Sequence, residues 1–205
     1  MDLLKIENEL KKRHLYDYTW GRKQSDDWDE KTNFIYKIDT FDELLKNIET
    51  FDSDLKNYAM NRWYNFHSAM AVEAIFAMHP NVIPNKNKYD KLVDFKINKI
   101  PFDHKTSVFP KGFDNSFDYA QNNVRELIRW LYRNQSNEGR MHFRNRLFIV
   151  LYDSINFEHW KLKAELTMLE SVIDNYINNF VFKNVQMFHL KDGTKVFSDV
   201  IWMIK

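Results

Sequence analysis

The chain of 205 residues contains no cysteine. This absence excludes disulfide frameworks, thiolate zinc sites and cysteine nucleophiles, and it is typical of proteins that fold in a reducing compartment. No apolar run approaches the roughly 20 residues that span a membrane, and the polar N-terminus does not resemble a signal peptide. We therefore expect a cytoplasmic protein without a membrane partner.

Glycine and proline are also scarce, at four residues each, so long flexible linkers are not expected. No glycine-rich phosphate loop is present, which argues against a nucleotide triphosphatase. Hydrophobic residues make up 44% of the chain and aromatic residues 16%, as in a protein with a packed core. The length predicts one domain over residues 1–205, with residues 1–50 as a mainly helical N-terminal extension.

Charge is unevenly distributed along a chain whose net charge is only +1. Residues 86–146 carry thirteen Lys and Arg residues against seven Asp and Glu residues, whereas residues 1–50 carry nine against twelve. A basic zone of this kind fits a polyanionic partner, and it equally fits a solvated surface. Within it, Arg125 and Arg129 continue a polar stripe that begins at Gln121 and recurs every four residues.

Hydrophobic periodicity predicts the elements of the fold. Apolar residues at helical spacing predict helices over 2–13, from Thr40, from about 52 to before Pro80, over 116–134 and over 158–180. Residues 21–33 are expected to form a loop. Alternating residues predict two strands between 91 and 107, the apolar run 147–152 predicts a central strand, and 185–204 predicts two strands about Asp192-Gly193. The fold class is therefore mixed α/β, with a central sheet flanked by helices.

The two strands between residues 91 and 107 place three chemically reactive side chains together. A two-residue turn at Asn98-Lys99 would pair Asp94 with Asp103, with β-carbons about 5 Å apart on one face. Lys105 would project from that same face. A divalent cation would remove the repulsion between the two carboxylates, and a lysine beside it could position a water and offset charge on a phosphoryl group. Asp90 replaces Asp94 if the turn is longer.

Glu73 is the only charged residue in the apolar run 69–78, which is expected to form the buried half of a helix. A buried carboxylate needs a compensating partner. Two interpretations remain open: a functional role beside the hairpin, or a structural position on a solvent stripe or in a salt bridge.

The segment from Val93 to Thr106 resembles the active-site hairpin of the PD-(D/E)XK phosphodiesterase superfamily, the restriction-endonuclease-like nucleases. The pattern of that family is an acid on one strand and Asp/Glu-x-Lys on the next, which Asp94, Asp103 and Lys105 match. The family often adds a glutamate from the preceding helix, where Glu73 stands. Val93 replaces the usual proline.

The resemblance implies a restriction-endonuclease-like core and hydrolysis of nucleic-acid phosphodiesters with Mg²⁺ or Mn²⁺. Asp94, Asp103, Glu73 and the backbone carbonyl of His104 would hold the metal, and Lys105 would position the nucleophile; the His104 ring is expected on the other side of the sheet. It implies DNA in preference to RNA as substrate, a homodimer where both strands are cut, and Gln121 facing the site. Arg125 and Arg129 would contact nucleic acid. The alternative is a non-catalytic nucleic-acid-binding or interaction module that retains the fold.

Overall fold

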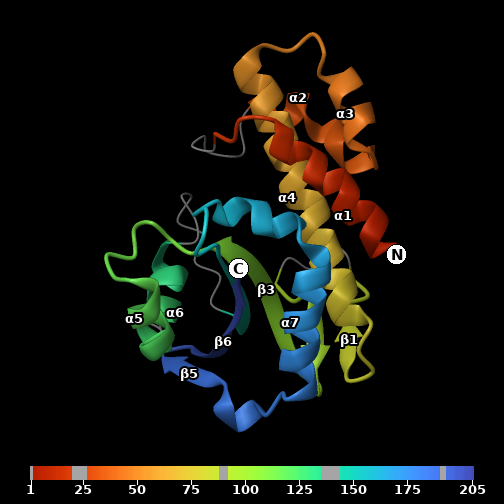
Figure 1. Cartoon of the computed structure of the whole chain (residues 1–205). Helices are drawn as coiled ribbons and strands as arrows, with labels where there is room; N and C mark the ends of the chain where they lie inside the picture. The colour runs from red at the N-terminus through yellow and green to blue at the C-terminus, as the bar shows by residue number, and fades with distance from the viewer. Residues whose placement is uncertain (1, 20–26, 88–91, 135–143, 190–192) are drawn as a thin grey trace.

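The protein is described here by a computed structural model, which covers residues 2–19, 27–87, 92–134, 144–189 and 193–205. Seven α-helices alternate with strands and short 3₁₀ segments in this part of the chain (Figure 1). The helices are α1 (Leu3–Lys12), α2 (Asp27–Lys31), α3 (Phe41–Asn47), α4 (Ser53–Ala77), α5 (Phe117–Asn122), α6 (Val124–Asn134) and α7 (Leu166–Asn178). No described helix is both long enough and apolar enough to cross a membrane.

The described strands form one mixed sheet in the order β1-β2-β3-β4-β6-β5. The strands are β1 (Val82–Pro84), β2 (Phe95–Ile97), β3 (Ile100–Val108), β4 (Arg146–Tyr152), β5 (Gln186–His189) and β6 (Lys195–Ile204). The first three run antiparallel to one another, β3, β4 and β6 run parallel, and β5 is antiparallel to β6. The predicted mixed α/β class with a central sheet is confirmed.

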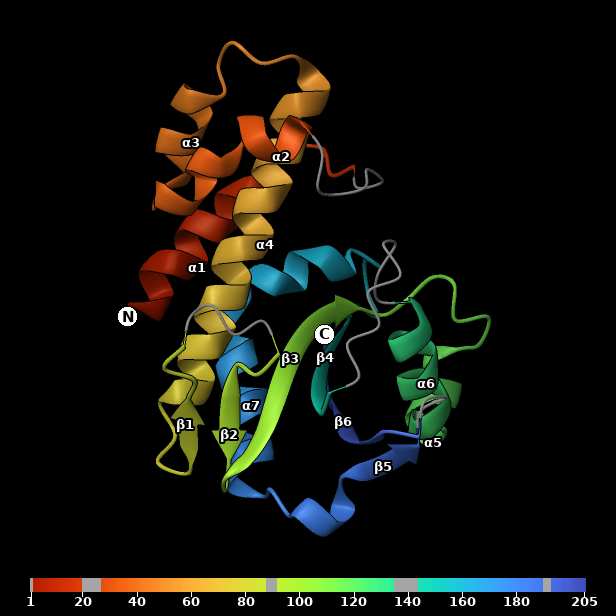
Figure 2. The ribbon, with the colours of Figure 1, turned by 180° about the vertical axis from the view of Figure 1, so that it is seen from behind.

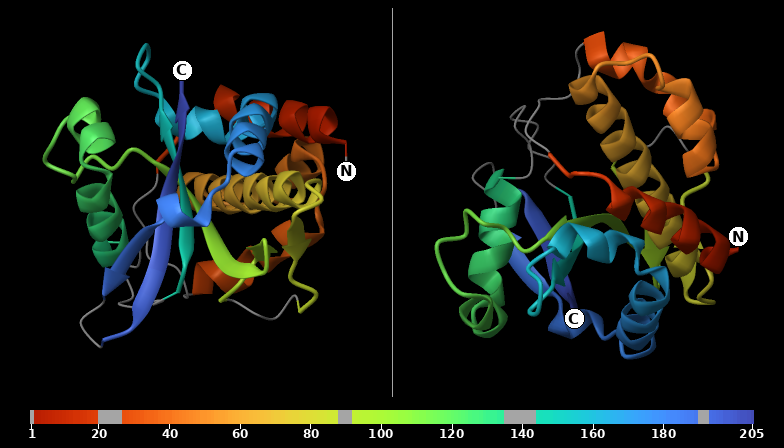
Figure 3. Two further views of the ribbon diagram at one scale, coloured as in Figure 1. Left: turned by 90° about the horizontal axis from the view of Figure 1, so that it is seen from below. Right: turned by 45° about the horizontal axis from the view of Figure 1, so that its top comes forward.

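Helices cover both faces of the sheet, as Figures 1 and 3 show. Strand β4 divides its side chains between two cores. Leu147, Ile149 and Leu151 join the core under α1, α4 and α7, whereas Phe148 and Val150 join the core under α5 and α6. A strand covered on both faces needs apolar residues at every position, which explains why the run 147–152 was recognisable as a central strand.

Helices α2 and α3 lie beside the first half of α4, away from the sheet, whereas α1 packs against both α4 and α7 (Figure 2). The predicted helix from about residue 52 is confirmed, because the Asp52 side chain accepts a hydrogen bond from the Leu55 N–H and begins α4. Thr40 likewise caps α3. The predicted loop over residues 21–33 is wrong in its second half, where α2 forms; residues 20–26 lie outside the described residues.

Two predicted helices are interrupted. The helix expected over 116–134 breaks at Asn123, whose side chain donates to the Tyr119 carbonyl and whose backbone leaves helical geometry. The helix expected over 158–180 begins as a 3₁₀ segment, His159–Ala164, before α7 starts. The predicted C-terminal strand pair corresponds to β5 and β6; Gly193 has a positive φ, and Asp192 lies outside the described residues.

Candidate metal centre

The hairpin of β2 and β3 has the predicted two-residue turn. Asn98 and Lys99 both adopt positive φ, as a tight hairpin turn requires, and Ile97 pairs with Ile100. The pairing continues to Phe95 and Phe102, but then it shifts. The Asp94 N–H donates to the carbonyl of Phe102, so two successive residues of one strand oppose a single residue of the other. This arrangement is a β-bulge, and a bulge redirects the side chain that it carries.

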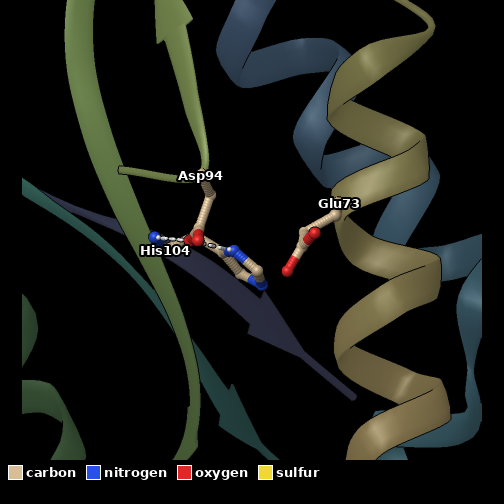
Figure 4. A group of neighbouring side chains, drawn as sticks. All are labelled: Glu73, Asp94 and His104. Carbon is tan, nitrogen blue, oxygen red and sulfur yellow. Dashed lines mark hydrogen bonds and ion pairs between the residues drawn. The ribbon is translucent and has the colours of Figure 1, made fainter. Parts of the chain in front are cut away.

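The redirected Asp94 carboxylate binds His104 twice. Its Oδ2 accepts the His104 backbone N–H at 2.7 Å and lies 2.9 Å from the ring Nδ1 (Figure 4). An ionised carboxylate can only accept, so Nδ1 carries the proton in this pair. In the neutral ring, the other nitrogen, Nε2, then keeps a lone pair. A histidine held in this way by a carboxylate is prepared to bind a metal through Nε2.

Glu73 approaches the same ring from helix α4, as Figure 4 shows. One ligand atom from each of Glu73, Asp94 and His104 lies within 4.8 Å of the other two. Two ligand atoms bound to one ion at 2.0–2.2 Å lie at most about 4.4 Å apart, so a small side-chain rotation would let Glu73 join the His104 Nε2 on one ion, while Asp94 stays bound to Nδ1 on the opposite edge of the ring. The three residues, which we call the Glu-Asp-His cluster, could therefore hold a divalent metal.

Burial increases across the cluster from Glu73, the most open of the three, through Asp94 to His104, which is 5% exposed. The rings of Phe76 and Phe95 pack within 6.2 Å of the imidazole and fix its orientation. The hydroxyl of Thr106, two residues along β3, is buried without a hydrogen-bond partner in the described part of the chain. The cluster is thus built on rigid elements at the edge of the core.

The electrostatic environments of the two carboxyl groups differ. Burial, reinforced by the nearby Asp94, raises the pKa of Glu73 above its usual value, against the opposing effect of His104. Burial also opposes ionisation of Asp94, but the hydrogen bonds from His104 outweigh it and hold the pKa of Asp94 below its usual value. Glu73 is therefore the carboxyl that more readily takes up a proton or exchanges it for a cation.

The prediction that Asp94 and Asp103 share one face is wrong. Asp103 points to the opposite side of the sheet, where its Oδ2 lies 2.5 Å from Nε of Arg146, its partner residue in β4. Both side chains are about 5% exposed, and the Arg146 guanidinium also lies 5.9 Å from the ring of Tyr132 in α6. The bulge at Asp94 is the physical reason, because it ends the alternation on which the prediction relied.

Lys105 stays with Asp103, as predicted, but apart from the Glu-Asp-His cluster. Its Nζ lies 3.7 Å from Asp103 Oδ1, and its side chain is half exposed. The His104 ring does face away from Lys105, as its position in the strand predicted. The ring, and not the predicted backbone carbonyl, is what His104 contributes to the cluster. Asp90, the alternative first ligand, lies outside the described residues.

The three predicted nucleic-acid contacts lie on the other side of the sheet from Glu73. Gln121 is exposed on α5. The Arg125 guanidinium in α6 binds Gln186 Oε1 at 2.8 Å and the Met187 carbonyl at 3.0 Å, and it lies over the Phe188 ring. Arg129 lies over the same ring at 5.9 Å. Gln121 therefore lies on the side of the sheet that carries Asp103 and not on the side of the Glu-Asp-His cluster, because α5 and α6 cover the Asp103 face.

Two functional contacts were not predicted from the sequence: the His104 ring in the cluster, and Arg146 as the partner of Asp103. The His104 ring alternates with Ile100 and Phe102 toward the core, and a titratable ring at a core-facing strand position is a signal that could have identified it. Arg146 begins β4, and only the parallel register of β3 and β4 reveals that it opposes Asp103.

Comparisons with protein families, with curated proteins and with solved structures found no match to this chain.

Proposed function

We propose that the protein is a metal-dependent nuclease whose divalent cation is held by Glu73 and the Nε2 of His104, with Asp94 orienting the imidazole. The observation that carries this proposal is the convergence of three ligand-type side chains from α4, the β2 bulge and β3 within 4.8 Å. A divalent cation bound there would lower the pKa of a water molecule and polarise a phosphodiester. Asp94 would fix the His104 tautomer, and Glu73, with its raised pKa, would support the metal or take a proton from water.

The arrangement of elements supports a restriction-endonuclease-like core. Helix α4 precedes three antiparallel strands, α6 follows them, and β4 then returns parallel to β3. The glutamate on the preceding helix and the aspartate before β2 occupy positions that the resemblance implies. His104 takes the place of the second carboxylate, and Lys105 lies outside the cluster. The imidazole in the donor set favours Mn²⁺ or Zn²⁺ over Mg²⁺.

The test is calorimetric titration with Mn²⁺, Zn²⁺ and Mg²⁺, followed by incubation with plasmid DNA and with single-stranded DNA and RNA. We expect His104→Gln and Glu73→Gln to lose metal binding and hydrolysis together. Lys105→Met is the matched control, because Lys105 is the adjacent residue of the strand and should leave metal affinity unchanged. Metal binding that depends on Lys105 and Asp103 but not on His104 would overturn the assignment.

A second candidate function is a non-catalytic nucleic-acid-binding module. The observation that favours it is the Asp103–Arg146 pair, which gives the acid of the Asp-x-Lys motif a structural partner. If wild-type protein binds oligonucleotides but shows no heat with any of the three metals, this candidate replaces the nuclease.

A further inference from the structure

A cavity of about 360 Å³ opens where β3, β4 and β6 begin. Its described lining residues are Leu92, Val93, Pro101, Arg144, Asn145, Thr194, Lys195 and Val196. Pockets for small ligands typically measure about 300–1,000 Å³, so a cavity of this size suits one small organic group and not a folded partner. None of the three residues of the Glu-Asp-His cluster lines it.

The charged residues among this described lining are of one sign. Arg144 and Lys195 are both exposed residues, and neither side chain makes an ion pair with another described residue. Leu92, Val93 and Pro101 supply an apolar wall beside them. A cavity with two cations at an apolar wall fits a ligand that carries a phosphate on a flat, weakly polar body.

The backbone around the cavity is held in place by hydrogen bonds. The Asn145 side chain bridges two strands, because its Nδ2 donates to the Pro101 carbonyl and its Oδ1 accepts from the Phe197 N–H. The Tyr132 hydroxyl donates to the Arg144 carbonyl at 2.7 Å. The cavity is thus formed before a ligand arrives, which reduces the entropy lost on binding.

One residue of the cavity lining is the direct neighbour in sequence of a residue of the Glu-Asp-His cluster. Val93 lines the cavity, and the next residue, Asp94, belongs to the cluster. The lining of the cavity is therefore directly bonded to the residue that orients His104.

We propose that this cavity binds one nucleotide unit of a nucleic-acid strand. The phosphate lies between Arg144 and Lys195, and the sugar or base lies on the wall formed by Leu92, Val93 and Pro101. The identification of the polymer as nucleic acid rests on the proposed function, whereas the preference for a phosphate rests on the cavity itself.

Binding of a fluorescein-labelled oligothymidylate, measured by anisotropy in EDTA, tests the inference. We expect the double variant R144A/K195A to bind at least about tenfold more weakly than wild type, with a smaller dependence on salt. The control R133A/K183A removes the same charge from two exposed positions outside the cavity and should change affinity less than about twofold. Lys195→Gln alone provides a milder variant, whose folding is checked by circular dichroism.

Competition with small ligands separates the phosphate from the nucleoside. Thymidine monophosphate should displace the oligothymidylate at lower concentration than inorganic phosphate, and thymidine should be the weakest competitor. Equal losses of oligothymidylate affinity in the two double variants, or no binding by wild type, would overturn the inference. Equal competition by inorganic phosphate and thymidine monophosphate would contradict the proposed contact between the nucleoside and the apolar wall. Because the assay contains EDTA, it measures binding at the cavity without a bound metal, so failure of the metal centre is distinguishable from failure of the cavity.

Discussion

The polar groups on the two faces of the sheet beside strand β3 differ in how far their hydrogen-bonding positions are used. On the face toward α6, Asp103 and Arg146 satisfy each other in a pair that is about 5% exposed. On the face toward α4, Asp94 binds His104 through one oxygen, while Glu73 makes no hydrogen bond to another described residue. We call the Asp103–Arg146 pair closed, because each charge has its partner. We call the Glu-Asp-His cluster open, because it keeps ligand atoms available for a metal. The comparison teaches that a buried acid indicates a site only when its bonding capacity is not already used.

Breaking the closed pair should have the largest effect on stability. Arg146→Ala would leave the buried Asp103 charge without its partner, and we expect it to lower the free energy of unfolding by about 3–5 kcal/mol. Arg144→Ala, an exposed arginine two residues earlier, is the control and should change it by about 0.5 kcal/mol or less. Urea unfolding monitored by tryptophan fluorescence measures both. Similar losses in the two variants would contradict the distinction between the faces.

Perturbing the open cluster should instead affect metal affinity. Asp94→Asn removes the carboxylate that fixes the His104 tautomer, and we expect Mn²⁺ affinity to fall about 10–100-fold. Asp103→Asn keeps the side-chain shape on the opposite face and should leave Mn²⁺ affinity within about threefold of wild type. Calorimetric titration of both variants compares the faces directly. A larger loss of affinity in Asp103→Asn than in Asp94→Asn would reverse the assignment.

Substitution of Arg125 tests how α6 is held against β5. Because it binds Gln186 and the Met187 carbonyl and lies over Phe188, Arg125→Ala should lower the free energy of unfolding by about 0.5–1 kcal/mol. Arg133→Ala, on an exposed position of α6, should have a smaller effect. Thermal unfolding of the two variants provides the measurement, and a stability loss confined to Arg133→Ala would show that Arg125 does not hold α6 against β5.

The smallest effect concerns the charge on Glu73. Its pKa is raised in the folded protein, so the contribution to stability is present below the unfolded pKa near 4.5 and is lost as pH rises through the folded pKa. In EDTA at pH 7, Glu73→Gln should therefore be more stable than wild type, by less than about 1 kcal/mol because solvent screens this open carboxyl. Unfolding measured between pH 4 and pH 7 checks this. A difference that does not change with pH would contradict it.

Much of the fold could be predicted because local signals agreed with the tertiary structure. The cap at Asp52, the positive-φ turn at Asn98-Lys99 and the uniformly apolar β4 each depend on neighbours in sequence. The break at Asn123 could not be predicted in the same way, because a single asparagine is compatible with a continuous helix.

The candidate site could be predicted only in part. Glu73 and Asp94 do meet, since the helix and the hairpin are adjacent in the chain and pack together. The exchange of Asp103 for the His104 ring depends on a one-residue bulge, and a bulge leaves no mark in the pattern of side chains. The pairing of Asp103 with Arg146 depends on the register of two parallel strands, and the two residues are 43 positions apart in the chain.

The central claim is that Asp94 holds the His104 ring with its proton on Nδ1 and its Nε2 directed toward a metal. Nitrogen-15 NMR of the labelled imidazoles, with His104→Gln used to assign the signal, tests this before and after addition of Zn²⁺. We expect the His104 ring to carry a proton on Nδ1 and its Nε2 signal to shift when Zn²⁺ is added. A ring protonated at Nε2, or a His104 signal that Zn²⁺ leaves unchanged, would contradict it.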